Sequence, residues 1–137
     1  MTRTQIREYI FTILFRVEFT KLEDFDEQIN FAMEEIAASD KLSEKNRAYM
    51  ESKLHAIVEH LPQIDEVIAK EAQGWKLSRI GKAELAILRL AVYEMKYEEE
   101  IPNRVAINEA VELAKSYCDE EAKGFVNAVL GNIERAL

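Results

Sequence analysis

The sequence predicts an all-α protein of about seven helices and no strands. In segment after segment, apolar residues recur at the three- and four-residue spacing that places them on one face of a helix. The 137 residues include only two prolines and four glycines, a composition that favours long helices. The links between the segments are short, which indicates antiparallel neighbours packed as bundles.

The first four predicted helices each begin at a recognisable start signal. Thr2 and Gln5 have the spacing of a capping box, so the first helix is expected to begin there. Asp24 can open the second helix, and Ser43 can cap the third. Pro62 suits the first turn of the fourth, where its missing N–H costs nothing. The expected inward residues are, helix by helix, Ile6, Tyr9, Ile10, Ile13, Leu14 and Val17; Phe25, Ile29, Met33 and Ile36; Met50, Leu54, Ile57, Val58 and Leu61; and Ile64, Val67 and Ile68.

Three more helices follow a predicted joint at Gly74 and Trp75. The fifth helix, from about Gly81 to Tyr97, is apolar nearly all round, which is typical of a buried central helix. The expected inward residues of the sixth and seventh are Ala106, Ala110, Leu113, Ala114 and Tyr117, and Phe125, Val126, Val129, Leu130, Ile133 and Leu137. We therefore expect a single domain, 1–137, with subdomains of about 1–73 and 74–137 and with Trp75 as a core anchor between them.

Composition and charge narrow the classes of function. A single cysteine, Cys118, excludes an internal disulfide framework and fits a reducing cytosol, so a cytoplasmic location is expected. No apolar run approaches the roughly 20 residues of a membrane span, and no signal-peptide core stands at the start. The net charge of −8 argues against general attraction to nucleic acid. Basic residues at 3–16 and 76–82 leave room for a local basic footprint, or for an ordinary solvated surface.

The sequence offers little enzyme chemistry. His55 and His60 are five residues apart, so on one helix they point about 140° from each other and cannot share a metal ion. Gly81 and Lys82 lack the glycine spacing of a phosphate-binding loop, and no nucleophile elbow is present. We expect no catalytic residues, no metal and no cofactor.

A set of phenylalanines on the first predicted helix suggests an interaction surface. Phe11, Phe15 and Phe19 are spaced as a ladder opposite the core face of the first helix, beside Arg7 and Arg3. Such aromatics can stack on unpaired bases or be buried between two helix layers, and Phe15 is expected to be the most exposed. An exposed Phe11 and Phe15 face could equally serve a homodimer.

Two kinds of polar residue inside the predicted helices also need partners. Arg89 lies in the apolar fifth helix and is expected to pair with Glu109 or Glu94. Asn108 and Asn127 have poor helix propensity, so each is expected to hydrogen-bond a helix end or a binding partner.

Three segments stand out in order along the chain: LRLAVYE at 88–94, Ile101 and Pro102 followed by VAINEAVELAK at 105–115, and FVNAVL at 125–130. Together they resemble the NusB family of transcription antitermination factors. The resemblance implies seven helices in two small packed bundles and no enzyme activity. It implies pairing with a small-subunit ribosomal protein and binding of the pair to boxA-type single-stranded RNA. It further implies assembly with RNA polymerase and other Nus factors on ribosomal RNA operons.

The resemblance also assigns site residues. The positions that match the family's RNA surface are Arg3, Arg7, Phe15, Lys82 and Phe125. Glu84 matches an acidic position that faces the ribosomal partner, and Glu121 lies in the loop just before the last helix. The family's arginine-rich N-terminus is reduced here to Arg3 and Arg7, and Ala128 stands where the family often has glycine.

Two other functions remain open from the sequence. The chain could be a helical protein-interaction module that binds RNA only through its partner, as the net charge of −8 and the reduced arginine arm suggest. NusB-like domains also occur fused to RNA cytosine methyltransferases, but 137 residues leave no room for a methyl-donor-binding domain.

Overall fold

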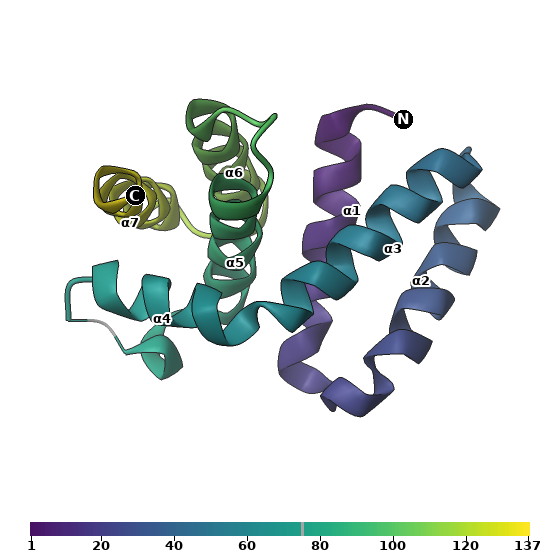
Figure 1. Cartoon of the computed structure of the whole chain (residues 1–137), viewed down its shortest axis with the longest axis horizontal. Coiled ribbons are helices and arrows are strands. Elements are labelled where there is room, and N and C mark those ends of the chain that lie inside the picture. The colour runs from purple at the N-terminus through teal and green to yellow at the C-terminus, as the bar shows by residue number, and fades with distance from the viewer. Residues whose placement is uncertain (75) are drawn as a thin grey trace. The chain divides into compact units, whose positions relative to one another are not determined.

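The computed structural model describes residues 1–74 and 76–137, and in them it contains seven α-helices, three short 3₁₀ turns and no strand. The helices are α1 (Arg3–Phe15), α2 (Phe25–Ser39), α3 (Glu44–Glu59), α4 (Leu61–Glu71), α5 (Lys82–Tyr97), α6 (Asn103–Tyr117) and α7 (Ala122–Ala136), as Figure 1 shows. The 3₁₀ turns are η1 (Arg16–Phe19), η2 (Leu22–Asp24) and η3 (Leu77–Arg79). The predicted fold class is confirmed. None of these helices is long and apolar enough to cross a membrane.

The helices form two compact units, Met1–Val58 and Glu59–Leu137. The structure thus divides the chain at the end of α3, earlier than the boundary predicted at Gly74 and Trp75. Gln73 (φ 48°) and Gly74 (φ 91°) adopt left-handed backbone, which ends α4 and redirects the chain. The helix ends here, but the second unit continues. Trp75, the predicted core anchor, lies outside the described residues.

Helix α4 belongs with the C-terminal helices because its side chains and its last turn bind them. Asp65 on α4 forms an ion pair with Arg89 on α5. At the end of α4, the side-chain amide of Asn132 on α7 donates to the carbonyl oxygen of Glu71 over 3.4 Å. Fixed to two of its neighbours, α4 is part of the second unit.

In the first unit, two of the three predicted start signals have the expected geometry, whereas Asp24 stands at the start of α2 without a side-chain capping hydrogen bond. The Thr2 hydroxyl accepts the Gln5 backbone N–H at 3.1 Å, and the Gln5 side chain accepts the Thr2 N–H at 2.7 Å, which completes the capping box. The Ser43 hydroxyl accepts the Asn46 N–H at 3.0 Å at the start of α3. The buried apolar residues of the three helices are Ile6, Ile10, Phe11, Ile13, Leu14, Phe25, Ile29, Ala32, Met33, Ile36, Met50, Leu54 and Ile57.

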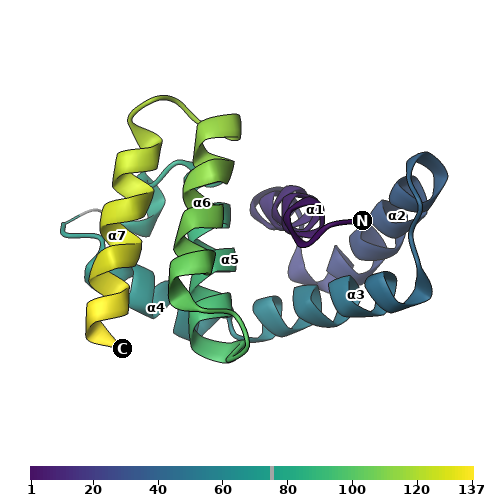
Figure 2. The ribbon, with the colours of Figure 1, turned by 90° about the horizontal axis from the view of Figure 1, so that it is seen from above.

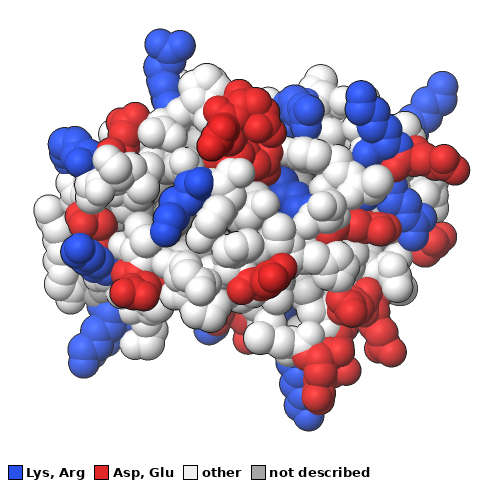
Figure 3. Space-filling view, viewed as in Figure 1, with Lys and Arg blue, Asp and Glu red and all other residues white. Residues whose placement is uncertain are grey.

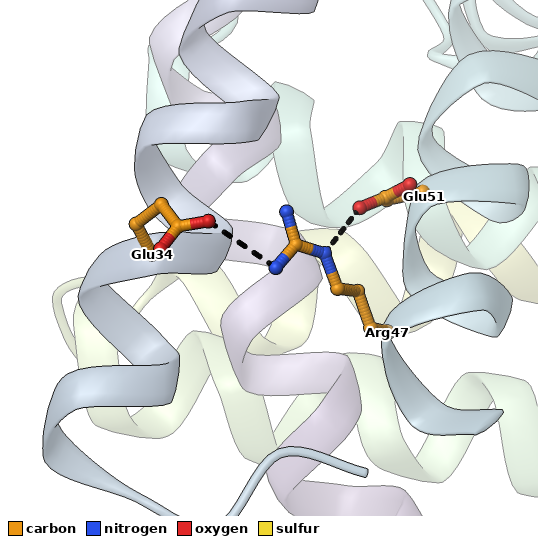
Figure 4. Close-up of polar contacts among 3 residues, drawn as sticks. All are labelled: Glu34, Arg47 and Glu51. Atoms are coloured by element: carbon orange, nitrogen blue, oxygen red, sulfur yellow. Dashed lines mark hydrogen bonds and ion pairs between the residues drawn. The ribbon is translucent and has the colours of Figure 1, made fainter. Parts of the chain in front are cut away.

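A charged cluster links α2 to α3 at the surface of this unit (Figure 4). The Arg47 Nε atom donates to Glu51 at 2.8 Å, and its Nη1 atom donates to Glu34 at 3.3 Å. The hydrogen bond that Arg47 donates to Glu51, and to a smaller extent the one that it donates to Glu34, raises the pKa of Arg47 above its usual value. Because the cluster is solvent-accessible, it orients the two helices more than it stabilises them.

In the second unit, α5 is the central helix, as its composition predicts. Nine of its sixteen residues are buried, including every position from 85 to 92. Helices α6 and α7 lie beside each other in antiparallel directions (Figure 2). Two predicted inward residues are instead exposed: Tyr117, 43% exposed, is the last residue of α6, and Leu137, 58% exposed, follows the end of α7. The predicted inward faces of α6 and α7 therefore each included one residue too many at the C-terminal end.

Candidate functional site

A surface hollow in the second unit brings together three predicted site residues. Its volume is about 240 Å³, and it lies where the turn before α5 meets the loop between α6 and α7. Its lining residues are Arg79, Ile80, Gly81, Glu84, Asp119, Glu121, Ala122 and Phe125. Glu84, Glu121 and Phe125 were expected here, whereas Arg79 and Asp119 were not. Lys82 is exposed in the first turn of α5, next to the lining residue Gly81.

The Glu84 carboxylate is held close to the start of α5. Glu84 is the third residue of α5. Its side chain folds back over Gly81, the N-cap residue of this helix. The Glu84 carboxylate occupies the place that a Cβ atom on Gly81 would need, so a side chain at position 81 would require the flexible Glu84 side chain to move. A carboxylate in the first turn also interacts favourably with the positive end of the helix dipole.

Cys118, at the end of α6, contacts the same carboxylate. Burial, the hydrogen bond to Glu84 and the negative charges of Glu84 and Asp119 together raise the pKa of the Cys118 thiol from about 9 to about 12. The thiol is therefore protonated near neutral pH and donates to Glu84. The hydrogen bond from Cys118 restricts where this carboxylate can lie, and Gly81 leaves the space that it occupies.

The charges around the hollow are mainly negative. Glu84, Asp119 and Glu121 contribute three carboxylates to its lining, against the single guanidinium of Arg79. The Asp119 side chain also accepts the Ala122 N–H at 3.1 Å, which fixes the loop before α7. A hollow of this charge attracts basic groups of a partner and repels phosphate.

The two predicted arginines of α1 differ sharply in exposure. Arg3 is exposed, and its guanidinium carbon lies 4.6 Å from the ring centre of Tyr49 on α3. Lys53 lies 5.3 Å from the same ring centre and its Nζ atom is 3.1 Å from the Tyr49 hydroxyl. Arg7 is only 7% exposed. Of the two, Arg3 therefore has its charge available to solvent, beside an aromatic ring that sequence reasoning did not single out.

The predicted phenylalanine ladder does not exist as a single helical stripe. Helix α1 ends at Phe15, and Phe19 lies in the following 3₁₀ turn, because the chain tightens at Arg16. Phe11 is 3% exposed, Phe15 is half-buried and Phe19 is 64% exposed. The expectation that Phe15 is the most exposed of the three was wrong. Phe15 and Phe19 form an edge-to-face pair with ring centres 5.3 Å apart.

Arg89 is buried, as expected, and has a carboxylate partner that the sequence did not suggest. Its Nε and Nη2 atoms donate to the two carboxylate oxygens of Asp65, each over 2.9 Å. Asp65 lies on α4, 24 residues earlier, and was not among the predicted partners, Glu94 and Glu109. This pair supports the packing of the second unit.

The part of the chain that the structure describes contains no cluster of three or more metal-binding side chains. His55 contacts Asp26 at 3.3 Å. The His60 ring packs against Tyr97, with ring centres 4.3 Å apart, and lies 6.3 Å from that of Tyr93.

Comparison with known protein families identifies the family of this chain. The model of the NusB family matches residues 4–135, almost the whole chain. The chain belongs to the NusB family. Members of the NusB family are transcription factors and not enzymes, in agreement with the prediction from the sequence.

Relatives within the NusB family are similar over nearly their full length. The transcription antitermination protein NusB of Agathobacter rectalis is 46% identical over 130 residues, which cover 95% of this chain and 97% of the relative. NusB of Bacillus subtilis is 42% identical over 134 residues, covering 98% and 95%.

Solved NusB structures share the fold. NusB of T. maritima superimposes with a TM-score of 0.88 at 32% identity, covering 98% of this chain and 92% of that one. A structure of the antitermination factors NusB and NusE in complex with dsRNA matches with a TM-score of 0.82 at 27% identity, covering all of both chains. The seven-helix arrangement is therefore that of the NusB family.

Proposed function

We propose that this chain is a cytoplasmic, RNA-binding transcription antitermination factor that pairs with a small-subunit ribosomal protein and binds boxA-type single-stranded RNA. In this proposal the pair joins RNA polymerase and other Nus factors and promotes transcription of ribosomal RNA operons. Its main support is the acidic hollow that holds Glu84, Glu121 and Phe125 together, in a chain similar to a NusB that was crystallised with NusE and RNA.

The hollow suits the ribosomal partner. Ribosomal proteins are rich in Lys and Arg because they bind ribosomal RNA, and three carboxylates against one guanidinium complement such a surface. We expect Glu84 to carry most weight in this interaction because the hydrogen bond from Cys118 orients its carboxylate before the partner arrives.

RNA contacts are assigned separately within each unit. In the first unit, Arg3 beside Tyr49 offers a charge and an aromatic ring, with Phe15 at the end of α1 and Arg7 as a largely buried support. In the second unit, Lys82 is exposed in the first turn of α5, and Phe125 lies half-buried in the first turn of α7. Cations bind phosphates, and aromatic rings stack on unpaired bases.

The test is a fluorescence-anisotropy titration of labelled boxA-type RNA and a scrambled RNA of equal length. The protein is titrated alone and with its ribosomal partner at several salt concentrations. Tighter, sequence-dependent binding in the presence of the partner is expected. With about three to five phosphate contacts, the log–log salt slope should lie near −2 to −3.5. Equal binding of both RNAs with and without the partner would contradict the proposal.

A second candidate function is a protein-interaction module without intrinsic RNA binding. It is favoured by the net charge of −8 and by the surface in Figure 3, where acidic and basic side chains are interspersed over the face shown. In this case the chain alone binds neither RNA, whereas Glu84→Lys abolishes the complex with the partner. RNA binding by the chain alone would exclude it.

A further inference from the structure

A second, differently charged surface lies between α6 and α7. Two adjoining hollows, of about 350 and 470 Å³, share Asn108 and Asn127 and so form one continuous depression. We call it the α6–α7 groove. Its lining residues are Arg104, Ile107, Asn108, Val111, Glu112 and Lys115 from α6, and Lys123, Gly124, Asn127, Ala128, Gly131, Glu134 and Arg135 from α7. The two helices run side by side in Figure 2.

The α7 side of the groove has small residues between its polar side chains. Gly124, Ala128 and Gly131 recur at the spacing that places them on one helix face. A Cβ atom on Gly124 would meet nothing within 4 Å, and one on Gly131 would meet only the Arg135 guanidinium, at 3.5 Å. A bound chain can therefore approach the α7 backbone closely at these three positions.

Two amide side chains stand at the middle of the groove. Asn108 and Asn127 are exposed, and neither makes a side-chain hydrogen bond within residues 1–74 and 76–137. The sequence predicted that each would bind a helix end or a partner, and the described structure supplies no helix end. Both amides keep a donor and an acceptor available at positions where asparagine costs helix stability.

The charges of the groove are mainly positive. Arg104 and Arg135 stand at one end, Lys115 and Lys123 at the other, against the two carboxylates of Glu112 and Glu134. Lys115 contacts Glu112 at 3.2 Å and Lys123 contacts Glu120 at 3.4 Å, but both lysines are about half exposed. Arg104 has no ion-pair partner among the described residues. In a chain of net charge −8, this groove is a local basic surface.

We propose that the α6–α7 groove binds a further segment of single-stranded RNA, beyond the contacts already assigned. At about 1.5 Å per residue, the groove from Arg104 to Lys115 is roughly 16 Å long, a length that suits a short stretch of a single strand. The cations at its two ends bind phosphates. The two asparagines between them bind base edges or 2′-hydroxyl groups, which need a donor and an acceptor together. The inference rests on the proposed function.

The experiment compares a short boxA-type RNA with the same RNA lengthened at either end by roughly eight uridines, about one single-strand binding site. Anisotropy titrations of the complex with the ribosomal partner are run at about 50 and 200 mM salt. Two double variants are tested, Asn108→Ala with Asn127→Ala, and Arg104→Ala with Arg135→Ala. The matched control is Lys41→Ala with Lys45→Ala, which removes two exposed lysines outside the groove.

The wild type and the lysine control are expected to bind one of the lengthened RNAs more tightly than the short one. Both groove variants should lose this gain and keep the affinity for the short RNA. For the arginine variant the salt slope should fall by about 1.4, two phosphates at about 0.7 each, so that the loss of affinity between the two salt concentrations shrinks about sevenfold. The asparagine variant should remain folded because alanine has the better helix propensity.

The outcomes separate this inference from the proposed function. If the short RNA binds but neither extension adds affinity, or if the groove variants keep the gain, the groove proposal is overturned and the proposed function stands. If the groove variants lose the ribosomal partner and keep the gain from the longer RNA, the groove is a protein surface and the proposal is overturned. If neither RNA binds, both proposals fail.

Discussion

The Arg89 guanidinium and the Asp65 carboxylate face each other with two parallel hydrogen bonds of 2.9 Å, which join α5 to α4. The Arg89 side chain is 10% exposed and that of Asp65 is 22% exposed. A paired geometry of this kind fixes the orientation of both helices as well as their distance. It explains why α4 packs in the second unit.

Removing Asp65 should destabilise the protein. Asp65→Ala leaves the Arg89 guanidinium buried without these two acceptors, which is expected to lower the free energy of unfolding by about 2 to 3 kcal/mol. Urea denaturation followed by circular dichroism measures it. The control is Glu66→Ala, an exposed neighbour on the same helix, for which a change within about 0.5 kcal/mol is expected. Equal losses in the two variants would contradict a stabilising role for the pair.

Crowding at the start of α5 should affect partner binding. In Gly81→Ala the new methyl group displaces the Glu84 carboxylate, and we expect the affinity for the ribosomal partner to fall about tenfold or more. Isothermal titration calorimetry gives the affinity. Glu84→Lys should abolish binding, whereas Glu66→Lys, the same charge reversal outside the hollow, should leave it within about threefold. An unchanged affinity in Gly81→Ala would show that the position of Glu84 is unimportant.

Cys118 should be unreactive while the protein is folded. Because its pKa is raised to about 12, alkylation by iodoacetamide at pH 8 is expected to be at least about tenfold slower than in urea, where the thiol regains an ordinary pKa. Glu84→Gln removes a cause of the shift and should accelerate alkylation of the folded protein. Equal rates in folded and unfolded protein would contradict this environment.

The same shift has a defined consequence for stability against pH. The folded pKa of Cys118 is raised above the unfolded value of about 9, so this thiol favours the folded state fully below pH 9. That contribution is lost as the pH rises from about 9 toward 12. Cys118→Ala should therefore flatten the decline of the melting temperature over this alkaline range. An identical decline in both proteins would exclude the thiol as its cause.

The two arginines of α1 should respond differently to substitution. Arg3→Ala removes an exposed charge, so the salt slope of RNA binding should fall by about 0.7 with little loss of stability. Arg7→Ala removes a guanidinium that is 7% exposed, and we expect it to lower the melting temperature more than it alters the salt slope. Lys45→Ala, an exposed lysine of the same unit, is the control for charge. Matching effects of the two arginine variants would contradict this division.

Local signals predicted the helices well because their causes are local. The capping box of Thr2 and Gln5 and the cap at Ser43 depend on residues three apart, and both have the expected hydrogen bonds. The phenylalanine ladder failed because its spacing assumed that α1 continues beyond Phe15, where the chain instead tightens into a 3₁₀ turn.

Contacts between residues far apart in the chain could not be predicted from local sequence patterns. Asp65 is 24 residues from Arg89, and nothing in the spacing selects it over other carboxylates. The site positions Glu84, Glu121 and Phe125 came from resemblance to a family, since no periodicity links residues on two separate loops. The position of the Glu84 carboxylate over Gly81 could be seen only in the structure, because a glycine before a helix usually indicates only a cap.

The contact between Gly81 and Glu84 also couples how these two positions can diverge. The glutamate carboxylate fills the space of the missing Cβ atom, and it is the end of a flexible side chain that can move away. A lineage that gains a side chain at position 81 therefore keeps its fold but loses this place for the Glu84 carboxylate. Across distant descendants, the carboxylate at position 84 should lie over the start of α5 only where glycine is kept at position 81.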